Sequence, residues 1–446
     1  MKKYSKYIYF LPWFICALGA LFYAYEYFLR VTPSVMTSQL SDTFKIDEAG
    51  LGNLSACYYY VYTPMQLIVG VLMDRYGPRR LLTMATLCCV MGSILFAATD
   101  NLLIAGLGRI FIGFGSAFAF VGVLKLGTIW LPRRVFATYA GLATALGMLG
   151  AAFGENALTR LVYLVGWRET VFISAFFGVF LAALIGFYVR DQALDKHGKV
   201  IKSANLDFEQ IITALIKIIK KPQMWFIGAV GALMYLGASA IAELWGNPYL
   251  EQAHGFTATQ AAFASSLIFI GYAVGSPTVG WISDKIKRRT SPLAVCALIA
   301  AALFSVLIYV PHLAFASICL LMFLFGAFSG AQPLVFALGK ELNSQKFAGS
   351  SLAFTNMAVM LSGVVLQPLI GYVLDKLWVG LHTPGGARLF DSHDWMIALS
   401  LVPICYVIAA IIAKFIVKET FCKAKESSIV ERISTHRDNI AKFSAS

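Results

Sequence analysis

Long apolar segments alternate with short polar ones along almost the whole chain. An apolar segment of about 20 residues can cross a bilayer as a helix, which satisfies its own backbone hydrogen bonds in lipid. The pattern therefore predicts an all-α polytopic membrane protein. The twelve predicted membrane-spanning segments cover about residues 8–38, 50–72, 81–99, 102–130, 136–161, 169–189, 224–250, 258–282, 292–311, 313–338, 348–375 and 395–417.

The composition agrees with this interpretation. Of the 446 residues, 59% are hydrophobic and only 13% are charged, whereas about 25% of the residues of a soluble domain are charged. A water-soluble protein of this length needs more charge to cover its surface. The composition therefore excludes the ordinary soluble classes.

The longest polar interruption divides the predicted helices into six and six. It predicts an N-terminal half at 1–190, a cytoplasmic linker at 191–223, a C-terminal half at 224–417 and a cytoplasmic tail at 418–446. The linker contains FEQIITALIKIIKKPQMW, in which apolar residues recur at helical spacing beside lysines. This spacing predicts an amphipathic surface helix that leads into the seventh span.

The basic residues fix the predicted orientation. Most of the 36 lysines and arginines fall in alternate polar connections, on the same side as both termini. Basic residues accumulate on the cytoplasmic side of membrane proteins. We therefore expect a multi-pass protein of the cell inner membrane with both termini in the cytoplasm, and we read the net charge of +13 as a topology signal, not as a nucleic-acid surface.

The two halves contain matching segments. GVLMDRYGPRR at 70–80 and GWISDKIKRRT at 280–290 align so that Asp74 matches Asp284 and Arg79 matches Arg289. Each segment ends the second predicted helix of its half. Two six-helix pseudo-repeats in the same orientation are typical of many secondary transporters.

These segments carry a family resemblance. GVLMDRYGPRR resembles the signature loop of the major facilitator superfamily, and the segment from Arg109 to Gly115 resembles the family's motif in the fourth helix. YFLRVTPSVM, GWRETVF and LWGNPYLEQAHGF resemble bacterial relatives of the lysosomal dipeptide transporter. The resemblance implies twelve helices that work by alternating access.

The resemblance also implies roles for the loop residues. In the family, such a cluster holds the halves together on the cytoplasmic side and breaks when that side opens. The residues expected to act in this coupling or gating are Asp74, Arg75, Arg79, Asp284 and Arg289. The alternative for the arginines is simple anchoring of the loop on the cytoplasmic side.

Glu26 and Arg30 are opposite charges in the first span, one helical turn apart and therefore on one face. A charge near the bilayer centre costs roughly 2.5–3.5 kcal/mol on insertion scales, so both side chains should face a water-filled cavity or each other. The alternative is that Arg30 reaches the outer interface and merely pairs with Glu26. Relatives that carry anions often place an arginine here, which favours substrate binding.

Arg109, Lys125 and Glu155 are further charged residues inside predicted spans. Arg109, at the start of the family-like motif, is expected in the cavity or in coupling, whereas Lys125 is expected to reach the cytoplasmic headgroups. Glu155 lies beside a stripe of glycines that lets another helix approach closely. It can point into the cavity and carry a proton; the alternative is an interfacial carboxylate.

Polar residues form stripes on three further helices. The residues predicted to line the cavity with Glu26 and Arg30 are Tyr58, Tyr62, Gln66, Tyr235, Ser239, Glu243, Asn247, Asn356 and Gln367. Tyrosines alone often serve only in helix packing. Several stripes that converge from the first, second, seventh and eleventh helices favour a binding cavity, because these helices line the cavity of the resembling fold.

The charges inside the spans suggest a substrate class. Arg30 and Arg109 stand against Glu26, Glu155 and Glu243, and a mixed lining suits a small polar or zwitterionic solute such as an amino acid, a short peptide or an organic acid. No Walker-type sequence is present, so the transport is expected to run without ATP, either coupled to protons or as facilitated diffusion. An exporter of drugs or metabolites and a siderophore importer remain open. The sequence predicts no enzyme, no cofactor and no metal site.

Overall fold

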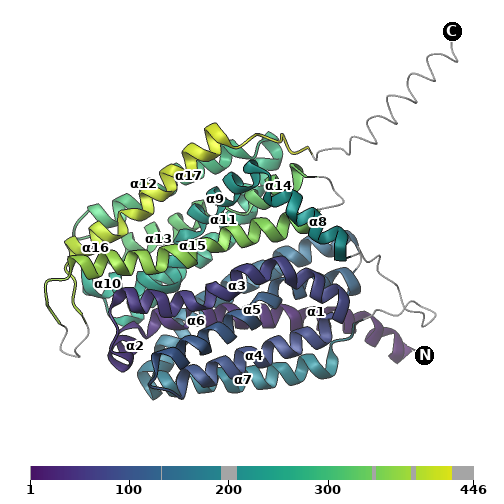
Figure 1. The fold of residues 1–446 in the computed structure, drawn as a ribbon, viewed down its shortest axis with the longest axis horizontal. Helices are drawn as coiled ribbons and strands as arrows, with labels where there is room; N and C mark the ends of the chain where they lie inside the picture. The colour runs from purple at the N-terminus through teal and green to yellow at the C-terminus, as the bar shows by residue number, and fades with distance from the viewer. Residues whose placement is uncertain (1, 132, 192–207, 344–347, 383–387, 424–446) are drawn as a thin grey trace, which may run out of the picture.

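The computed structural model describes residues 2–131, 133–191, 208–343, 348–382 and 388–423, and it is built of helices arranged in two halves (Figure 1). The N half contains α1 (Lys2–Val31), η1 (Thr32–Val35), α2 (Thr37–Phe44), α3 (Glu48–Tyr76), α4 (Pro78–Ala97), α5 (Leu102–Trp130), α6 (Arg133–Val165) and α7 (Trp167–Tyr188). The C half contains α9 (Pro222–Leu236), η2 (Gly237–Trp245), α10 (Gly246–His254), α11 (Ala258–Ile286), α12 (Thr290–Tyr309), α13 (Phe315–Ser329), α14 (Leu334–Glu341), α15 (Ala348–Leu377), α16 (Ser392–Leu399), α17 (Leu401–Ile411) and η4 (Ile412–Ile416). Between the halves in sequence, α8 (Phe208–Ile219) packs beside α9 and α15.

The predicted all-α membrane fold is confirmed. Among the described residues, ten helical stretches are long and apolar enough to cross a membrane. The other two predicted spans, 50–72 and 136–161, correspond to α3 and α6, which are 29 and 33 residues long. These two helices pack between the halves, α3 against α15 and α6 against α11.

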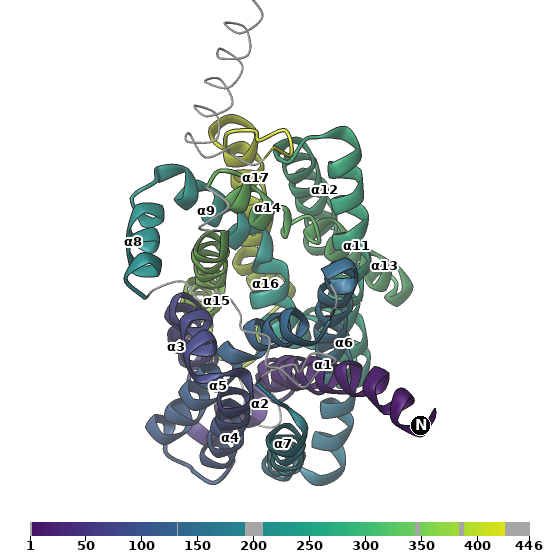
Figure 2. The ribbon, with the colours of Figure 1, turned by 90° about the vertical axis from the view of Figure 1, so that its right-hand side faces the viewer.

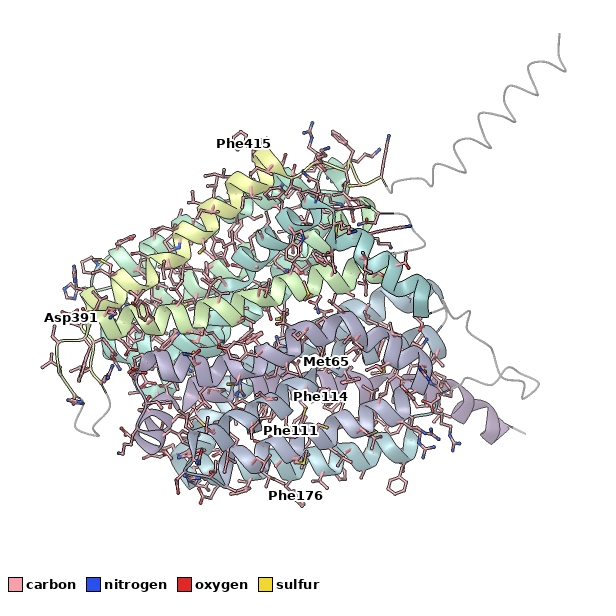
Figure 3. The ribbon with its side chains drawn as sticks, viewed as in Figure 1. Met65, Phe111, Phe114, Phe176, Asp391 and Phe415 are labelled. Atoms are coloured by element: carbon pink, nitrogen blue, oxygen red, sulfur yellow. The ribbon has the colours of Figure 1, made fainter. Side chains whose placement is uncertain are left out.

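The outer surface of the bundle is apolar. Phe176 in α7 and Phe415 in η4 project from opposite sides of the molecule (Figure 3) and are 77% and 79% exposed. An exposed apolar surface of this extent marks contact with a membrane or with another protein. In a chain with ten candidate spans, that surface faces the lipid.

Several spans are interrupted helices. The first predicted span ends as an α-helix at Val31, and η1 follows with Pro33 in its first turn. The seventh runs through a π-helical segment, η2, between α9 and α10. The tenth breaks after Ser329 and resumes at Leu334, next to Pro333, which fixes its own φ and has no N–H to donate. The interruptions place 3₁₀, π-helical and turn backbone where the two halves face each other.

The halves meet closely at one end of the bundle, here called the distal end, which carries α2 and the connection after α15 (left in Figure 1). The carboxylate of Asp375 accepts hydrogen bonds from the backbone N–H groups of Glu48 at 3.0 Å and Ala49 at 2.7 Å. Asp375 of the C half thus caps the first turn of α3 in the N half. A Cβ at Gly52 would lie 2.6 Å from the carbonyl oxygen of Gln367, so glycine permits this approach.

The opposite end, here called the basic end, carries the α3–α4 connection at Gly77 and the α11–α12 connection at Lys287–Arg289. Figure 2 views the molecule from this end, with the N half below and the C half above. A cavity of about 490 Å³ lies here between α3, α5, α14 and α15, and Leu215 of α8 borders it. The halves therefore close at the distal end and separate toward the basic end.

Candidate functional site

Arg30 lies at the centre of a polar cluster that both halves build. It is in the last turn of α1, where the helix dipole favours a cation, and it is only 1% exposed. Its guanidinium donates to the carboxylate of Glu26, to the hydroxyl of Tyr58 at 3.2 Å and to the hydroxyl of Tyr235 at 3.1 Å. Glu26 and Tyr58 belong to the N half and Tyr235 to the C half. One buried cation thus holds groups from both halves.

Four tyrosine rings surround the same guanidinium. Its central carbon lies 4.4 Å from the ring centre of Tyr27, 5.0 Å from that of Tyr62, 5.2 Å from that of Tyr58 and 5.8 Å from that of Tyr59. A cation within about 6 Å of an aromatic ring is attracted by the ring's electrons. The rings therefore stabilise the Arg30 charge in a place with little water.

A second carboxylate, Glu243, reaches Arg30 from the C half. Its Oε1 lies 3.8 Å from Nη1 of Arg30, and its Oε2 accepts from the Tyr59 hydroxyl. Glu243 lies in η2, a π-helical segment; such segments are frequent at functional sites. Arg30 therefore stands between two buried glutamates, one from each half, and each glutamate also holds a tyrosine.

The π-helix divides the stripe that the sequence predicted at steps of four. Tyr235 and Glu243 contact Arg30, whereas the Ser239 hydroxyl lies 2.8 Å from that of Ser362. The side-chain amide of Gln367 donates to the Ser239 backbone oxygen at 2.5 Å. Ser239 and Gln367 thus hold η2 against α15 inside the C half.

Two other predicted residues link the halves nearer the basic end. The Asn356 side-chain amide of α15 donates to Oε1 of Gln66 in α3 at 2.8 Å. Both residues line the cavity that opens toward the basic end. This pair is therefore a polar contact between the halves beside that cavity.

Glu155 forms a separate buried cluster toward the distal end. It accepts a hydrogen bond of 2.7 Å from the Ser34 hydroxyl of the N half and another of 2.7 Å from the Asn247 side-chain amide of the C half. Glu155 has no exposed surface. The carboxylate therefore ties α6 and η1 to α10 through neutral donors.

Arg109 is the second buried cation of the centre. Its Nη1 donates to the backbone oxygen of Leu29 at 3.2 Å, and its guanidinium lies 5.4 Å from the ring centre of Tyr58. Within the part of the chain that the structure describes, its Nε and Nη2 have no hydrogen-bond partner. Both guanidinium groups therefore lie near the Tyr58 ring. The unpartnered N–H groups of Arg109 remain able to donate hydrogen bonds. Lys125, sixteen residues further along α5, is half-buried and does not belong to this cluster.

A central cavity of about 570 Å³ lies next to Arg30. Tyr27, Tyr62 and Tyr235 line it, and the same three side chains contact the guanidinium. The tyrosines therefore stand between the cavity and the cation. The central cavity adjoins the one at the basic end; the residues that line both are Phe120, Pro333, Phe336 and Asn356.

The loop residues of the C half are paired. Arg289 forms ion pairs with Asp284 at 2.7 Å and Glu341 at 2.9 Å, and the carboxylate of Glu419 accepts from the backbone N–H groups of Arg289 and Thr290. Burial acts to lower the pKa of Arg289, but its hydrogen bonds to Glu341 and Asp284 raise it above the usual value. Burial likewise acts to raise the pKa of Glu419, but the hydrogen bonds that it accepts outweigh burial and lower that pKa.

The matching loop of the N half is arranged differently. The backbone N–H of Arg79 donates to Asp191 at 2.7 Å, and its side chain donates to the backbone oxygen of Gly186 at 2.8 Å. Arg75 is exposed, with its guanidinium 5.4 Å from the ring centre of Tyr76. The side chain of Asp74 lies outside the described residues.

Several residues of these clusters were absent from the predicted site. Tyr27, Tyr59, Ser34 and Asp375 all contact a predicted residue or join the two halves. Tyr27 follows Glu26 directly and Tyr59 follows Tyr58 directly. A tyrosine next to a predicted site residue was therefore a signal in the sequence, but a search at four-residue spacing does not select it. No local signal in the sequence marks Ser34 or Asp375.

One group of residues has the spacing of a metal site. The ligand atoms of Asp391, His393 and Asp394 lie within 4.8 Å of one another. Asp391 caps the start of α16, and Asp394 bonds back to the N–H of Asp391. Capping of the helix explains these carboxylates.

Comparison with known proteins places the chain among transporters. The family model described as Major Facilitator Superfamily matches residues 16–367. The chain is 24% identical over 379 residues to the probable sulfoacetate transporter SauU of Cupriavidus necator, covering 81% of this chain and 87% of that protein. It is 22% identical over 400 residues to the probable galactarate/D-glucarate transporter GudP of Escherichia coli, covering 80% and 88%.

Solved structures match the fold over nearly the full length. A bacterial homolog of the human lysosomal transporter Spinster, in an inward-facing and unoccupied conformation, matches with a TM-score of 0.74 at 16% identity, covering 90% of this chain and 96% of that chain. A point mutant of the nucleoside transporter NupG matches with a TM-score of 0.69 at 15% identity, covering 90% and 98%. These likenesses concern the fold.

Proposed function

Since the chain belongs to the Major Facilitator Superfamily of multi-pass membrane transporters, we propose that it moves a small solute with an anionic group by alternating access. The observation that carries this proposal is Arg30, a buried cation beside the central cavity that contacts both halves. A guanidinium binds a carboxylate or sulfonate with several hydrogen bonds at once. Arg30 is the residue that receives the anionic group.

Binding at Arg30 acts on the contacts between the halves. The solute enters the cavity, breaks the hydrogen bond that joins the hydroxyls of Tyr27 and Tyr235 at 3.4 Å, and takes the place of a glutamate on the guanidinium. Because Tyr235 and Glu243 come from the C half, this exchange replaces contacts across the centre. Solute binding thereby shifts the balance between the conformation open at the basic end and one open at the distal end.

The orientation follows from the basic residues. The loops at Gly77 and at Lys287–Arg289 carry clustered arginines and lysines, which accumulate on the cytoplasmic side of membrane proteins. We assign the basic end, with both termini, to the cytoplasm of the cell inner membrane. The conformation described is then the one open to the cytoplasm.

The charges favour a zwitterion such as an amino acid or short peptide. Arg30 stands between Glu26 and Glu243, so a carboxylate that binds Arg30 leaves a glutamate free to receive an ammonium group. The net charge of the cluster then stays constant. A zwitterion fits this arrangement better than a sugar phosphate.

A second candidate is an organic acid carried together with a proton. The named relatives are probable transporters of sulfoacetate and of galactarate or D-glucarate. An anion that displaces Glu26 or Glu243 from Arg30 leaves that glutamate as a buried carboxylate without a cation beside it. Binding of a proton to the displaced glutamate would neutralise this charge. This candidate predicts transport that a proton gradient drives, whereas facilitated diffusion of the same anion is independent of the gradient. Drug export and siderophore import do not require that Arg30 bind an anion.

The test is uptake by the purified protein in proteoliposomes. The panel contains labelled amino acids, dipeptides, sulfoacetate and galactonate, each with and without an inward proton gradient. The Arg30→Gln variant should lose uptake, and Arg160→Gln, which removes an exposed arginine of α6, serves as the matched control. Uptake that survives in Arg30→Gln, or no uptake of any anionic solute, overturns the proposal.

A further inference from the structure

We propose that the transported solute is amphipathic, with its anionic group at Arg30 and an apolar or aromatic body in the central cavity. This inference rests on the proposed function and narrows its substrate class to apolar or aromatic amino acids and to alkyl or aryl carboxylates. The chemistry of the cavity lining carries it.

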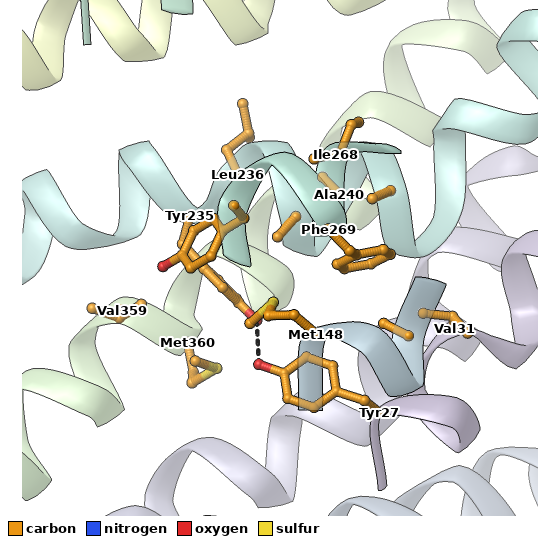
Figure 4. Close-up of a cluster of buried hydrophobic side chains, with 14 of the residues drawn as sticks. Tyr27, Val31, Met148, Tyr235, Leu236, Ala240, Ile268, Phe269, Val359 and Met360 are labelled. Atoms are coloured by element: carbon orange, nitrogen blue, oxygen red, sulfur yellow. Dashed lines mark hydrogen bonds between the residues drawn. The ribbon is translucent and has the colours of Figure 1, made fainter. Parts of the chain in front are cut away.

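Beyond the tyrosines, bulky apolar side chains dominate the lining. They come from α5, α6, α14 and α15, and they are Phe120, Leu142, Met148, Phe336, Val359 and Met360. Figure 4 shows Met148 beside the hydroxyls of Tyr27 and Tyr235, with Met360 and Val359 near them on α15. The space next to the Arg30 cluster is therefore bounded by hydrocarbon, sulfur and aromatic rings.

Most polar groups of the lining already have partners inside the protein. The Tyr272 hydroxyl donates to Gln332 at 2.5 Å, the Asn356 amide donates to Gln66 at 2.8 Å, and the Thr144 hydroxyl donates to the backbone of its own helix at 2.9 Å. Among the described residues, the Gln332 side-chain nitrogen has no partner, and its two N–H groups are free to donate. A body with many hydroxyl groups finds few hydrogen bonds here.

The loss of affinity caused by unpaired solute hydroxyl groups decides which substrate class the cavity favours. Each solute hydroxyl that leaves water without a partner lowers the affinity by roughly tenfold, and a sugar acid carries several. An apolar body instead gains from leaving water. The lining therefore selects against the hydrophilic acids after which some relatives are named and in favour of apolar bodies.

Met148 and Met360 in the cavity lining can accommodate apolar solute groups of different shapes. Methionine is unbranched and flexible, and its sulfur makes favourable contacts with aromatic rings. Met148 and Met360 face the cavity from the N half and the C half respectively. Together they can pack against leucine-sized and phenylalanine-sized groups alike, so we expect preference for apolar character without strict choice of shape.

The test compares solutes matched in charge. Uptake into proteoliposomes is measured for labelled phenylalanine and leucine against serine and glutamine, and for phenylacetate against galactonate. The apolar member of each comparison should be taken up at least about tenfold faster at equal low concentration. Equal or faster uptake of the polar members overturns the inference.

The outcome separates this inference from the proposed function. Uptake of galactonate or serine that equals or exceeds that of the apolar solutes and requires Arg30 refutes the apolar body and leaves the anion site standing. Uptake that is unchanged in Arg30→Gln for every solute refutes both. The two failures are therefore distinguishable with the same preparation.

A substitution in the lining provides a second readout. Met360→Gln keeps the length of the side chain and adds an amide, so the ratio of phenylalanine uptake to glutamine uptake should fall about tenfold. Met357→Gln lies on the same helix outside the lining and should leave the ratio as in the wild type. Because the readout is a ratio, a lower yield of folded protein does not change it. An unchanged ratio in Met360→Gln contradicts the inference.

Discussion

Arg30 of α1 and Glu243 of η2 belong to different halves, and their charged atoms lie 3.8 Å apart with both side chains 1% exposed. Within the hydrogen-bonded cluster, Glu26 holds the same cation from the N half. The centre of the molecule is thus one cation shared between two carboxylates. Whatever takes Arg30 from Glu243 removes an attraction between the halves.

Replacing Arg30 by glutamine should abolish uptake and also lower the thermal stability of the protein. The substitution removes the cation that compensates two buried carboxylates, which typically costs about 3–5 kcal/mol. Arg30→Lys keeps the charge but lacks the fork that reaches Tyr58 and Tyr235 together, so it should retain stability better than uptake. Thermal unfolding in detergent and uptake in proteoliposomes measure the two effects. Wild-type uptake in Arg30→Lys would contradict the role of the fork.

Glu243→Gln should uncouple transport from a proton gradient. The variant keeps the shape of the side chain but can neither attract Arg30 as a charge nor bind and release a proton. Stimulation of uptake by an inward proton gradient should disappear, while exchange of labelled for unlabelled solute continues. Glu169→Gln, which removes an exposed carboxylate of α7, is the control. Full gradient stimulation in Glu243→Gln would exclude Glu243 from coupling.

Removing the Asp375 carboxylate should open the distal end. Asp375 caps the first turn of α3 from the other half, and loss of a helix cap costs about 1 kcal/mol, which changes an equilibrium about fivefold. Asp391→Ala removes a cap within the C half, on α16, and should leave the halves as they are.

Spin labels at Ser38 and Thr259, which are exposed on the distal sides of the two halves, report this opening. The labels are introduced in a cysteine-depleted background, where a short distance reports the closed distal end and a long distance reports the open one. The fraction of molecules with the long distance should grow in Asp375→Ala and stay constant in Asp391→Ala. An unchanged distance distribution in Asp375→Ala would show that the cap does not hold the distal end closed.

The contact of Glu419 with the start of α12 should persist on mild acidification. The pKa of this carboxyl lies below its usual value, so its hydrogen bonds contribute stability above the unfolded pKa of about 4.3. That contribution is lost only as the pH falls through the lower folded value. Glu419→Gln should therefore lower the unfolding temperature equally at pH 7 and pH 5, by an amount equivalent to about 1 kcal/mol or less because the side chain is half-exposed.

The difference between Glu419→Gln and the wild type should then shrink below about pH 4. Thermal unfolding over this pH range makes the comparison. A difference that already vanishes at pH 5 would place the folded pKa of Glu419 above its usual range and contradict the hydrogen bonding described.

The fold was predictable because lipid allows few solutions. Apolar stretches of bilayer length must be helices, and the matching segments at 70–80 and 280–290 gave the two halves. α3 and α6 pack between the halves, against α15 and α11. Part of their polar surface meets protein, a contact that hydropathy alone does not distinguish from water.

The site was predictable where helical spacing holds and less so where it breaks. Glu26 and Arg30 lie one regular turn apart and do meet. Steps of four in the seventh span cross a π-helix, so Ser239 turns toward α15 while Glu243 reaches Arg30. Ser34 lies in a short 3₁₀ turn, and Asp375 acts on a helix of the other half, so their roles depend on tertiary structure.

Binding of phenylalanine and of phenethylamine, its decarboxylated analogue, to the purified protein tests the central claim most directly. Calorimetry on the wild type should show phenylalanine binding at least about 30-fold more tightly, as expected for a desolvated charge pair. In Arg30→Gln this preference should vanish, while Arg160→Gln keeps it. A preference for the carboxylate that persists undiminished in Arg30→Gln would show that the anionic group binds elsewhere.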